Sequence, residues 1–343
     1  MRNILKNIVL LSAVFFLSAE HGFAKNITLK LTHNSGAIEC AYEHGYSDVK
    51  KITLYRSTTP MDEIPLNIIE YPISVYALSP DGNVYRDNQF ADNVTYYYKL
   101  EILLKNNKKK YSKTTAITIS DKKIGALRNP VIIVDKKNYV LELRSSGSVK
   151  KYPVALGQDP VGRKLHQDNS TTPEGFYRIT NLRPVATYYK AYDLNYPNKI
   201  DRYRYDFYKK HKLMSRRGNG SYPRIGGSIQ IHGKGIYNNW TWGCIAMRNA
   251  DIDELFGLST IKKKTKVVIL GENLTRQDVK LIENVSISQI SKIQEKLKDK
   301  KIYTGRADGL LGRYTRNSIA LYQYNNNLPV TFEIDSRVIT LLD

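Results

Sequence analysis

Residues 226–248 read GGSIQIHGKGIYNNWTWGCIAMR and contain one of only two cysteines in a chain of 343 residues. Apolar and polar residues alternate in SIQIH, which predicts a strand that ends with His232 on its polar face. Cys244 follows twelve residues later and comes directly after a glycine. This arrangement can bring the two side chains together, but the residues alone leave Cys244 open as a nucleophile or as a small apolar filler.

A thiol beside an imidazole can attack a carbonyl carbon. The neighbouring ring lowers the pKa of the thiol from its usual value near ~8.5 and so favours the thiolate. Gly243 lets a carbonyl substrate approach the backbone closely, and the N–H groups of Gly243 and Cys244 are candidate donors to the oxyanion of a tetrahedral intermediate. No metal-ligand spacing involves His232 and Cys244, so we expect no metal at this pair.

The second cysteine, Cys40, lies in AIECAY. It shares one face of a predicted strand with Ile38 and Tyr42, which is typical of an inert thiol in a hydrophobic core.

Residues 1–24 have the layout of a secretory signal peptide. Arg2 and Lys6 precede an apolar run, and small residues precede the expected cleavage after Ala24. The run is shorter than the ~20 residues of a membrane-spanning helix, and no later segment is apolar for long enough. We therefore expect a protein of the periplasm or outside the cell with no stable membrane insertion after cleavage; an uncleaved anchor is the alternative.

The formal net charge of the chain is +21 at pH 7. Such an excess favours anionic surroundings, which for an exported protein are the cell wall, its attached polymers and lipid headgroups rather than nucleic acid. A basic surface that only keeps the protein soluble explains the charge equally well.

Periodicity and composition predict a multidomain, mainly β protein. Residues 25–120 read as alternating strands and predict a β-sandwich. Residues 127–271 read as strands with one closing helix, and we expect a mostly β unit. Residues 286–343 contain amphipathic helices separated by glycine turns, which predicts a small three-helix bundle.

Three features of the middle unit carry more specific expectations. Residues 181–223 are rich in tyrosine, weakly periodic and too long for an ordinary connection, so they are a candidate lid or substrate-binding insertion. Asp251 is expected to cap the helix that begins DIDELF. His166 lies in the polar loop KLHQDNSTT and is expected at the surface.

The middle unit resembles the L,D-transpeptidase catalytic domain, the YkuD-like family of cell-wall enzymes. The family motif is His-Gly, a variable loop, Ser or Thr, any residue, Gly and Cys, and HG at 232–233 with TWGC at 241–244 satisfies it. Further matching segments are VALG, TPEGFYRI, YPN, GGSIQIHG and the helix start NADIDEL. The resemblance covers about 145 residues.

The resemblance implies a mostly β catalytic domain that works without a cofactor. It implies that a peptidoglycan stem peptide acylates the cysteine, that the terminal D-amino acid leaves, and that an amine acceptor or water then takes the acyl group. The implied roles are nucleophile for Cys244, base and acid for His232, orientation of the imidazole by the backbone carbonyl of Gly233, and shaping of the pocket for Thr241 and Gly243.

One departure bears on the acceptor. Many relatives have arginine two residues after the cysteine, where this chain has Ala246, and the GCIA form also occurs in relatives that act as carboxypeptidases or cleave other wall linkages. Arg248 is the nearest arginine and is either a substitute for the missing charge or a solvated residue beside a helix start. The leading hypothesis is a periplasmic L,D-transpeptidase of peptidoglycan biosynthesis, with a role in cell wall organization and cell shape. The alternatives are an L,D-carboxypeptidase or related hydrolase with the same Cys/His pair, and a wall-binding protein without activity.

The flanking units also resemble known domains. SPDGN, DNVTYYYKLEI and SKTTAITIS resemble a fibronectin type III-like domain, which implies a spacer or partner module. IQEKL, ADGLLG, TRNSIALYQ and NNNLPV resemble a three-helix peptidoglycan-binding domain. The oligomeric state is left open by the sequence.

Overall fold

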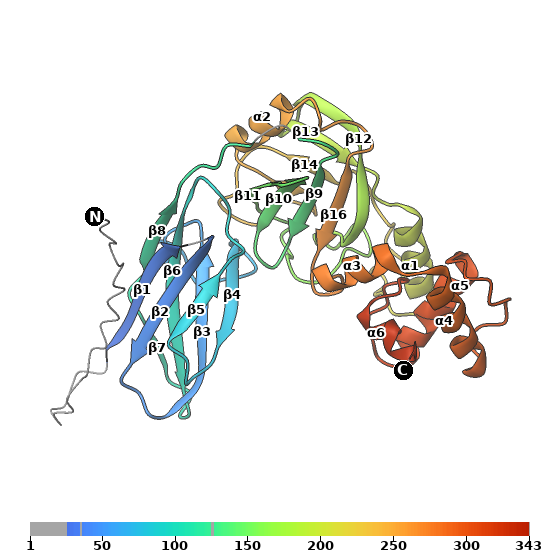
Figure 1. Ribbon diagram of the computed structural model, residues 1–343, viewed down its shortest axis with the longest axis horizontal. Coiled ribbons are helices and arrows are strands. Elements are labelled where there is room, and N and C mark those ends of the chain that lie inside the picture. The colour runs from blue at the N-terminus through green and yellow to red at the C-terminus, as the bar shows by residue number, and fades with distance from the viewer. Residues whose placement is uncertain (1–25, 35, 125–126, 343) are drawn as a thin grey trace, which may run out of the picture.

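The computed structural model describes residues 26–34, 36–124 and 127–342. The predicted signal peptide lies outside this part of the chain. Within it, a β-sandwich, a central sheet flanked by helices, and a helical unit follow one another in chain order (Figure 1). The expectation of a multidomain, mainly β protein with a C-terminal helical bundle is confirmed.

The first unit is built from two antiparallel sheets. The strand order is β1-β2-β5 in one sheet and β4-β3-β6-β7 in the other, where β8 also pairs with β6. The period-2 pattern explains the packing, since alternate residues of β6 from Tyr96 to Ile102 are all buried. The strands are β1 (Ile27–Asn34), β2 (Ala37–His44), β3 (Val49–Ser57), β4 (Ile73–Leu78), β5 (Val84–Asp87), β6 (Val94–Leu104), β7 (Lys109–Tyr111) and β8 (Thr115–Ile119).

A buried arginine joins this sandwich to the central unit. Arg56 on β3 is 1% exposed and pairs with the equally buried Asp87. It also donates to the backbone oxygen of Asn138 at 2.7 Å, and Tyr76 donates to the side chain of Asn138 at 3.1 Å. Because a buried charge must keep its partners, these bonds fix one unit against the other.

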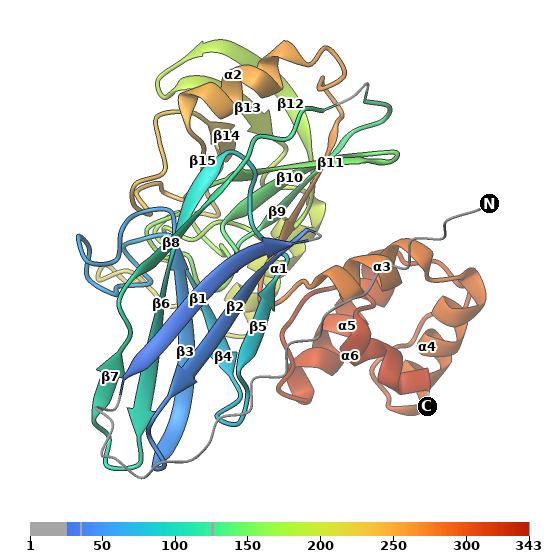
Figure 2. The same ribbon diagram turned by 60° about the vertical axis from the view of Figure 1, so that its left-hand side comes forward.

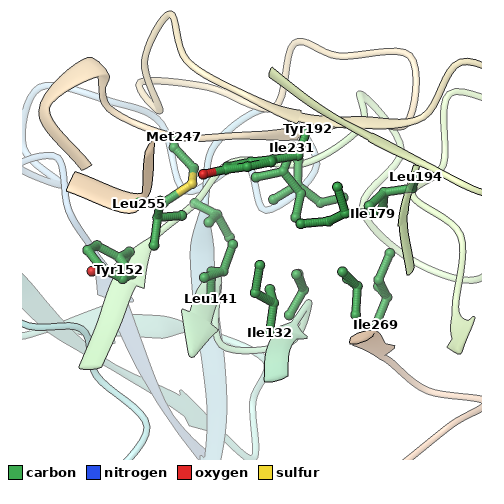
Figure 3. Close-up of a cluster of buried hydrophobic side chains, with 14 of the residues drawn as sticks. Ile132, Leu141, Tyr152, Ile179, Tyr192, Leu194, Ile231, Met247, Leu255 and Ile269 are labelled. Atoms are coloured by element: carbon green, nitrogen blue, oxygen red, sulfur yellow. The ribbon is translucent and has the colours of Figure 1, made fainter. Parts of the chain in front are cut away.

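The central unit is one sheet with the order β11-β10-β9-β16-β12-β13-β14-β15. Most neighbours are antiparallel, whereas β9 with β16 and β14 with β15 are parallel. The larger hydrophobic core lies on one face of this sheet (Figure 3), and a smaller buried cluster that includes Val268 and Leu270 lies on the other face. The elements are β9 (Val131–Asp135), β10 (Val140–Ser145), β11 (Ser148–Pro153), β12 (Gly175–Ala186), β13 (Tyr189–Leu194), α1 (Lys199–Lys210), β14 (Gln230–His232), β15 (Ile245–Ala246), α2 (Asn249–Gly257) and β16 (Lys266–Leu270).

Residues 181–223, expected to be a candidate lid or substrate-binding insertion, include the end of β12, all of β13 and the helix α1; their role stays a prediction. The tyrosines of the β12–β13 hairpin follow no simple alternation of apolar and polar residues, so the sequence did not show the period of 2. The expectation for Asp251 was wrong. Asp251 does not cap α2, because the cap position is Arg248 and Asp251 lies in the first turn, where its carboxylate accepts from the Arg248 guanidinium.

The last unit is helical, as its periodicity predicted. Its core is formed by buried residues of α4, α5 and α6 with a closing turn. A helix before it, α3, was not predicted, and a capping box between Thr275 and Asp278 starts it. The elements are α3 (Arg276–Asn284), α4 (Ile287–Asp299), α5 (Arg313–Asn325), α6 (Ser336–Ile339) and a short 3₁₀ turn (Thr340–Leu342).

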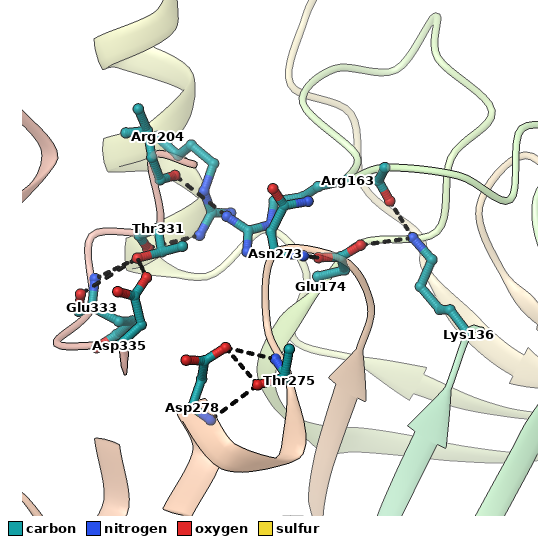
Figure 4. Close-up of polar contacts among 12 residues, drawn as sticks. Lys136, Arg163, Glu174, Arg204, Asn273, Thr275, Asp278, Thr331, Glu333 and Asp335 are labelled. Atoms are coloured by element: carbon teal, nitrogen blue, oxygen red, sulfur yellow. Dashed lines mark hydrogen bonds and ion pairs between the residues drawn. The ribbon is translucent and has the colours of Figure 1, made fainter. Parts of the chain in front are cut away.

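A buried polar network joins the central and helical units (Figure 4). Arg204 on α1 donates to the backbone oxygen of Thr331 at 3.3 Å, and its charge is balanced by Asp201. Nearby, the fully buried Glu174 pairs with Lys136 at 3.1 Å. Figure 1 shows the helical unit against α1, on the side of the central unit away from the sandwich, and Figure 2 shows the same units turned by 60°.

Candidate active site

The parallel pairing of β14 and β15 brings His232 and Cys244 to the same face of the sheet. The register pairs Ile231 with Ile245 and His232 with Ala246, and Cys244 directly precedes β15. Ile231 and Ile245 are both fully buried in the core on the opposite face. Since side chains alternate along strands, His232 and Cys244 are diagonal neighbours on this face.

The imidazole of His232 is fully buried and held in one orientation. Its Nδ1 donates to the backbone oxygen of Gly233 at 2.8 Å, which leaves the lone pair on Nε2. Nε2 is buried and has no hydrogen-bond partner among the described residues. Burial lowers the pKa of His232, against the opposing effect of the Gly233 carbonyl. The ring is therefore neutral at neutral pH.

Two aromatic rings enclose this imidazole. Tyr188 lies with its ring centroid 4.9 Å from that of His232, and Trp240 lies 5.3 Å from it on another side. The two aromatic rings also contact each other edge to face. Tyr188 comes from the β12–β13 hairpin, within the segment that the sequence suggested as a lid. This packing excludes water from the ring, which is the cause of its lowered pKa.

Cys244 is half-buried, and its Sγ lies 3.6 Å from the backbone oxygen of Ser228. Burial raises the pKa of the thiol, while a backbone hydrogen bond from Gln230 and the charge of Lys164 oppose the rise. At neutral pH the thiol of Cys244 is therefore protonated, and the ring of His232 is neutral.

Lys164 is a residue of this site that the sequence analysis missed. Its side chain is 4% exposed, and its ammonium donates to the backbone oxygens of Asn169 at 2.7 Å and Trp242 at 3.0 Å. Burial lowers the pKa of Lys164 to about 8, and the neighbouring Cys244 and Asp168 oppose that change. One lysine in a strongly basic chain carries no distinguishing pattern, so only the fold reveals it.

Thr241 and Gly243 set the turn that presents the cysteine. Thr241 donates through Oγ1 to the backbone oxygen of Cys244 at 2.8 Å and accepts from the N–H of Gly243 at 3.2 Å. Gly243 has φ +117°, and a Cβ there would lie 2.6 Å from the backbone oxygen of Thr171. Glycine is thus required both by the backbone angle and by the space.

Three other positions discussed from the sequence make contacts elsewhere or are buried. Arg248 pairs with Asp251 at 2.6 Å and donates to the backbone oxygen of Asn93 in the sandwich at 2.9 Å. Ala246 is fully buried and exchanges two backbone hydrogen bonds with Ala155. His166 was expected at the surface but is half-buried, with its Nδ1 buried and the pKa of the ring lowered by burial.

Residues 26–34, 36–124 and 127–342 contain no group of three or more His, Cys, Asp or Glu side chains arranged to hold a metal ion. Over the same ranges, no helix is both long enough and apolar enough to cross a membrane.

Comparison with known families assigns two parts of the chain. Residues 129–269 match the YkuD model of the L,D-transpeptidase catalytic domain, and residues 286–342 match the PG_binding_1 model of a peptidoglycan binding domain. The chain therefore carries an L,D-transpeptidase catalytic domain followed by a domain of the peptidoglycan-binding type.

Among individual relatives, the chain is similar to YafK of Escherichia coli K12, which is named as an L,D-transpeptidase. The two are 32% identical over 111 residues. This match spans 32% of the present chain and 36% of the length of YafK. The likeness therefore concerns about a third of each protein.

Solved structures show weaker likenesses. Bd1075 of Bdellovibrio bacteriovorus is 23% identical with a TM-score of 0.30, covering 52% of this chain and 63% of its own. An L,D-transpeptidase from Xylanimonas cellulosilytica is 14% identical with a TM-score of 0.27, covering 44% and 64%. A human fibronectin type III domain is 16% identical with a TM-score of 0.23, covering 32% and 98%. These scores are low, so the description of the fold rests on the elements above.

Proposed function

We propose that this protein is a cofactor-free cysteine enzyme that modifies peptidoglycan as an L,D-transpeptidase. The observation that carries the proposal is the parallel β14–β15 pairing, with His232 and Cys244 on one face and Nδ1 of His232 bound to the Gly233 carbonyl. The matched catalytic-domain family supports the reaction class. Stem peptides of peptidoglycan are the proposed substrates and partners.

In the proposed acylation step, Nε2 of His232 takes the thiol proton and Sγ of Cys244 attacks the carbonyl carbon of the stem peptide. A C–S bond forms, the C–N bond to the terminal D-amino acid breaks, and the imidazolium returns its proton to the leaving amine. An acceptor amine then attacks the thioester, which restores the thiol and forms a new C–N bond. Lys164 supports this cycle by stabilising negative charge that develops on sulfur.

The positions near the cysteine serve this step in different ways. Thr241 and Gly243 hold the turn in which Cys244 lies. The N–H of Gly243, expected from the sequence as an oxyanion donor, is engaged by Oγ1 of Thr241, so the backbone N–H of Cys244 is the proposed donor. Arg248 has a structural role in this proposal, because its guanidinium is already engaged by Asp251 and Asn93.

An L,D-carboxypeptidase is the second candidate, and Ala246 favours it. Relatives with arginine at this position have a positive side chain near the cysteine, whereas Ala246 is apolar and buried. Without that charge the acyl-enzyme has one fewer group to bind an acceptor stem, and water takes its place.

A product assay distinguishes these candidates. The purified protein is incubated with defined tetrapeptide muropeptides and a labelled D-amino acid, and the products are resolved by mass spectrometry. Exchanged or crosslinked stems support transfer, while trimmed monomers alone support hydrolysis. Cys244→Ala should lower turnover by at least about 10³-fold. Cys40→Ala is the matched control, because Cys40 is fully buried in the sandwich core and should leave turnover unchanged. Equal rates in both variants, or an inactive wild type that still binds sacculi, would favour a wall-binding protein.

We further propose export to the periplasm through cleavage of residues 1–24, and a division into units at 25–120, 127–271 and 286–343. In this proposal the last unit holds the enzyme on the wall, and the activity serves cell wall organization and cell shape. An N-terminus at Lys25 in protein recovered from the periplasm is the expected result; a retained Met1 would oppose cleavage.

A further inference from the structure

The loop between His232 and Cys244 is bound by the N-terminal sandwich. Residues 67–71, which connect β3 to β4, lie against residues 237–239 of this loop. Asn239 donates through its backbone N–H to the backbone oxygen of Glu70 at 2.6 Å and through Nδ2 to that of Ile69 at 3.0 Å. The rings of Tyr71 and Tyr237 pack edge to face at 5.8 Å.

Asn239 connects these contacts to the catalytic domain. Its side chain is 4% exposed, and its Oδ1 accepts from the backbone N–H of Leu156 at 3.1 Å. Nδ2 also lies 3.3 Å from the hydroxyl of Tyr139, which donates to Ile68 of the sandwich. One end of the amide is thus fixed within the catalytic domain and the other end is fixed by the sandwich.

The next residue in the chain reaches the imidazole. Trp240 packs on His232 and Tyr188, and its indole N–H donates to the backbone oxygen of Gly235 at 3.2 Å. On its other side the loop continues into Thr241, which holds the turn before Cys244. A displacement of Asn239 would therefore reach both members of the pair.

The sandwich is held firmly enough to act as a support. The buried Arg56 of the sandwich donates to the backbone oxygen of Asn138. The backbone N–H of Asp92 donates to the backbone oxygen of Lys151, and the N–H of Lys151 donates to the carboxylate of Asp92. The buried Val140 of the catalytic domain packs within the sandwich core. A segment carried by such a docked unit imposes its geometry on the loop that it contacts.

We propose that the N-terminal sandwich is a structural part of the active site, with residues 67–71 holding the loop between His232 and Cys244 and Asn239 acting as the positioning residue. This inference rests on the proposed function. It assigns the sandwich more than a spacing role: an enzyme without residues 67–71 would keep both reacting side chains but lose their alignment.

Asn239→Asp tests the contact selectively. The carboxylate can still accept from the N–H of Leu156, but it offers no donor to the oxygen of Ile69 and repels it. Tyr71→Ala weakens the same contact from the sandwich side. Tyr111→Ala is the matched control, since this half-exposed tyrosine lies on β7, at the end of the sandwich away from the catalytic domain (Figures 1 and 2).

Turnover is the first readout. We expect kcat of Asn239→Asp to fall by roughly tenfold or more with KM changed less, because a shift of about 1 Å in a reacting group is costly. The kcat of Tyr71→Ala should also fall, by a smaller factor. The inference is overturned when both variants keep kcat within twofold of Tyr111→Ala.

Alkylation by iodoacetamide is the second readout and needs no turnover. The chain has two cysteines, and mass spectrometry of peptides reports each one separately. Loosening the loop exposes Cys244 to solvent, so at pH 7 its alkylation in Asn239→Asp should be severalfold faster than in wild type. The fully buried Cys40 should stay unmodified, which excludes global unfolding as the cause.

These readouts separate failure of the inference from failure of the proposed function. A wild type that turns over no muropeptide refutes the proposed enzymatic function. The alkylation of Cys244 then still tests whether residues 67–71 hold the loop. If alkylation of Cys244 is unchanged in both variants, residues 67–71 do not hold the loop, even when the wild type is active.

Discussion

Gly243→Ala is the most demanding test of the turn that presents the cysteine. A methyl group at this position would lie 2.6 Å from the backbone oxygen of Thr171 and 3.3 Å from the ammonium of Lys164. The first neighbour is backbone and cannot rotate away. Because Cβ contacts under 3.0 Å essentially never occur, the chain must shift by at least about 0.4 Å. The shift falls on the residue directly before the nucleophile.

A second glycine in the same loop separates this crowding from backbone strain. Gly235 has φ +100°, close to the +117° of Gly243, but a Cβ there would meet no atom within 4 Å. Gly235→Ala therefore adds only the strain of a side chain in the left-handed region, about 1–3 kcal/mol of lost stability. Gly243→Ala adds overpacking of a further ~1–3 kcal/mol.

The two variants are compared by denaturant unfolding and by muropeptide turnover. We expect Gly243→Ala to be the less stable and to lose about 10²-fold in kcat, as displacement of a nucleophile does, while Gly235→Ala loses less than about tenfold. Equal losses in the two variants would refute the reasoning, because they would show that crowding at Thr171 has no effect on the position of Cys244.

Three further predictions follow from the charges. Lys164→Met should lower kcat/KM about tenfold and slow the alkylation of Cys244 near pH 8, because the thiolate loses its nearby cation; an unchanged alkylation rate would oppose this. Because burial lowers the pKa of His232 below 6.5, the acidic limb of the kcat/KM profile should have its midpoint below pH 6.5, and a midpoint above it would contradict a buried neutral base. Glu174→Ala leaves a buried lysine ammonium unpaired and should cost about 3–5 kcal/mol in urea unfolding, whereas Asp168→Ala breaks an exposed pair and should cost measurably less.

Much of the fold could be predicted because its signals are local. Alternation in β6 and β9 to β11, the helical period of α4 and α5, and the turn glycines all act within a few residues. The segment 181–223 could not be read in this way, because tyrosines on a hairpin that covers His232 follow no simple alternation of apolar and polar residues. The sheet order was also beyond reach, since β16 inserts between β9 and β12 through contacts far apart in sequence.

The candidate pair His232 and Cys244 followed from motif spacing, whereas its surroundings did not. Lys164 reaches Trp242 from a loop nearly eighty residues earlier, and Asn239 takes its partners from residues 69–70 of the sandwich. Neither residue has a sequence pattern that marks it, because its significance depends on what the tertiary fold places beside it. Arg248 illustrates the reverse case: its position near the cysteine suggested substrate, and the fold directs it to Asp251.

The position of Trp240 against His232 gives the protein a built-in optical reporter. The chain has two tryptophans, Trp240 and Trp242, and both lie in the loop that leads to Cys244. Fluorescence excited at the red edge of indole absorption therefore originates entirely beside the reacting groups. Trp240 touches the imidazole, while Trp242 is 76% exposed, so the two emit from a shielded and a solvated environment. Protonation of the ring, acylation of sulfur and arrival of a stem peptide can each be followed in real time without attaching a dye.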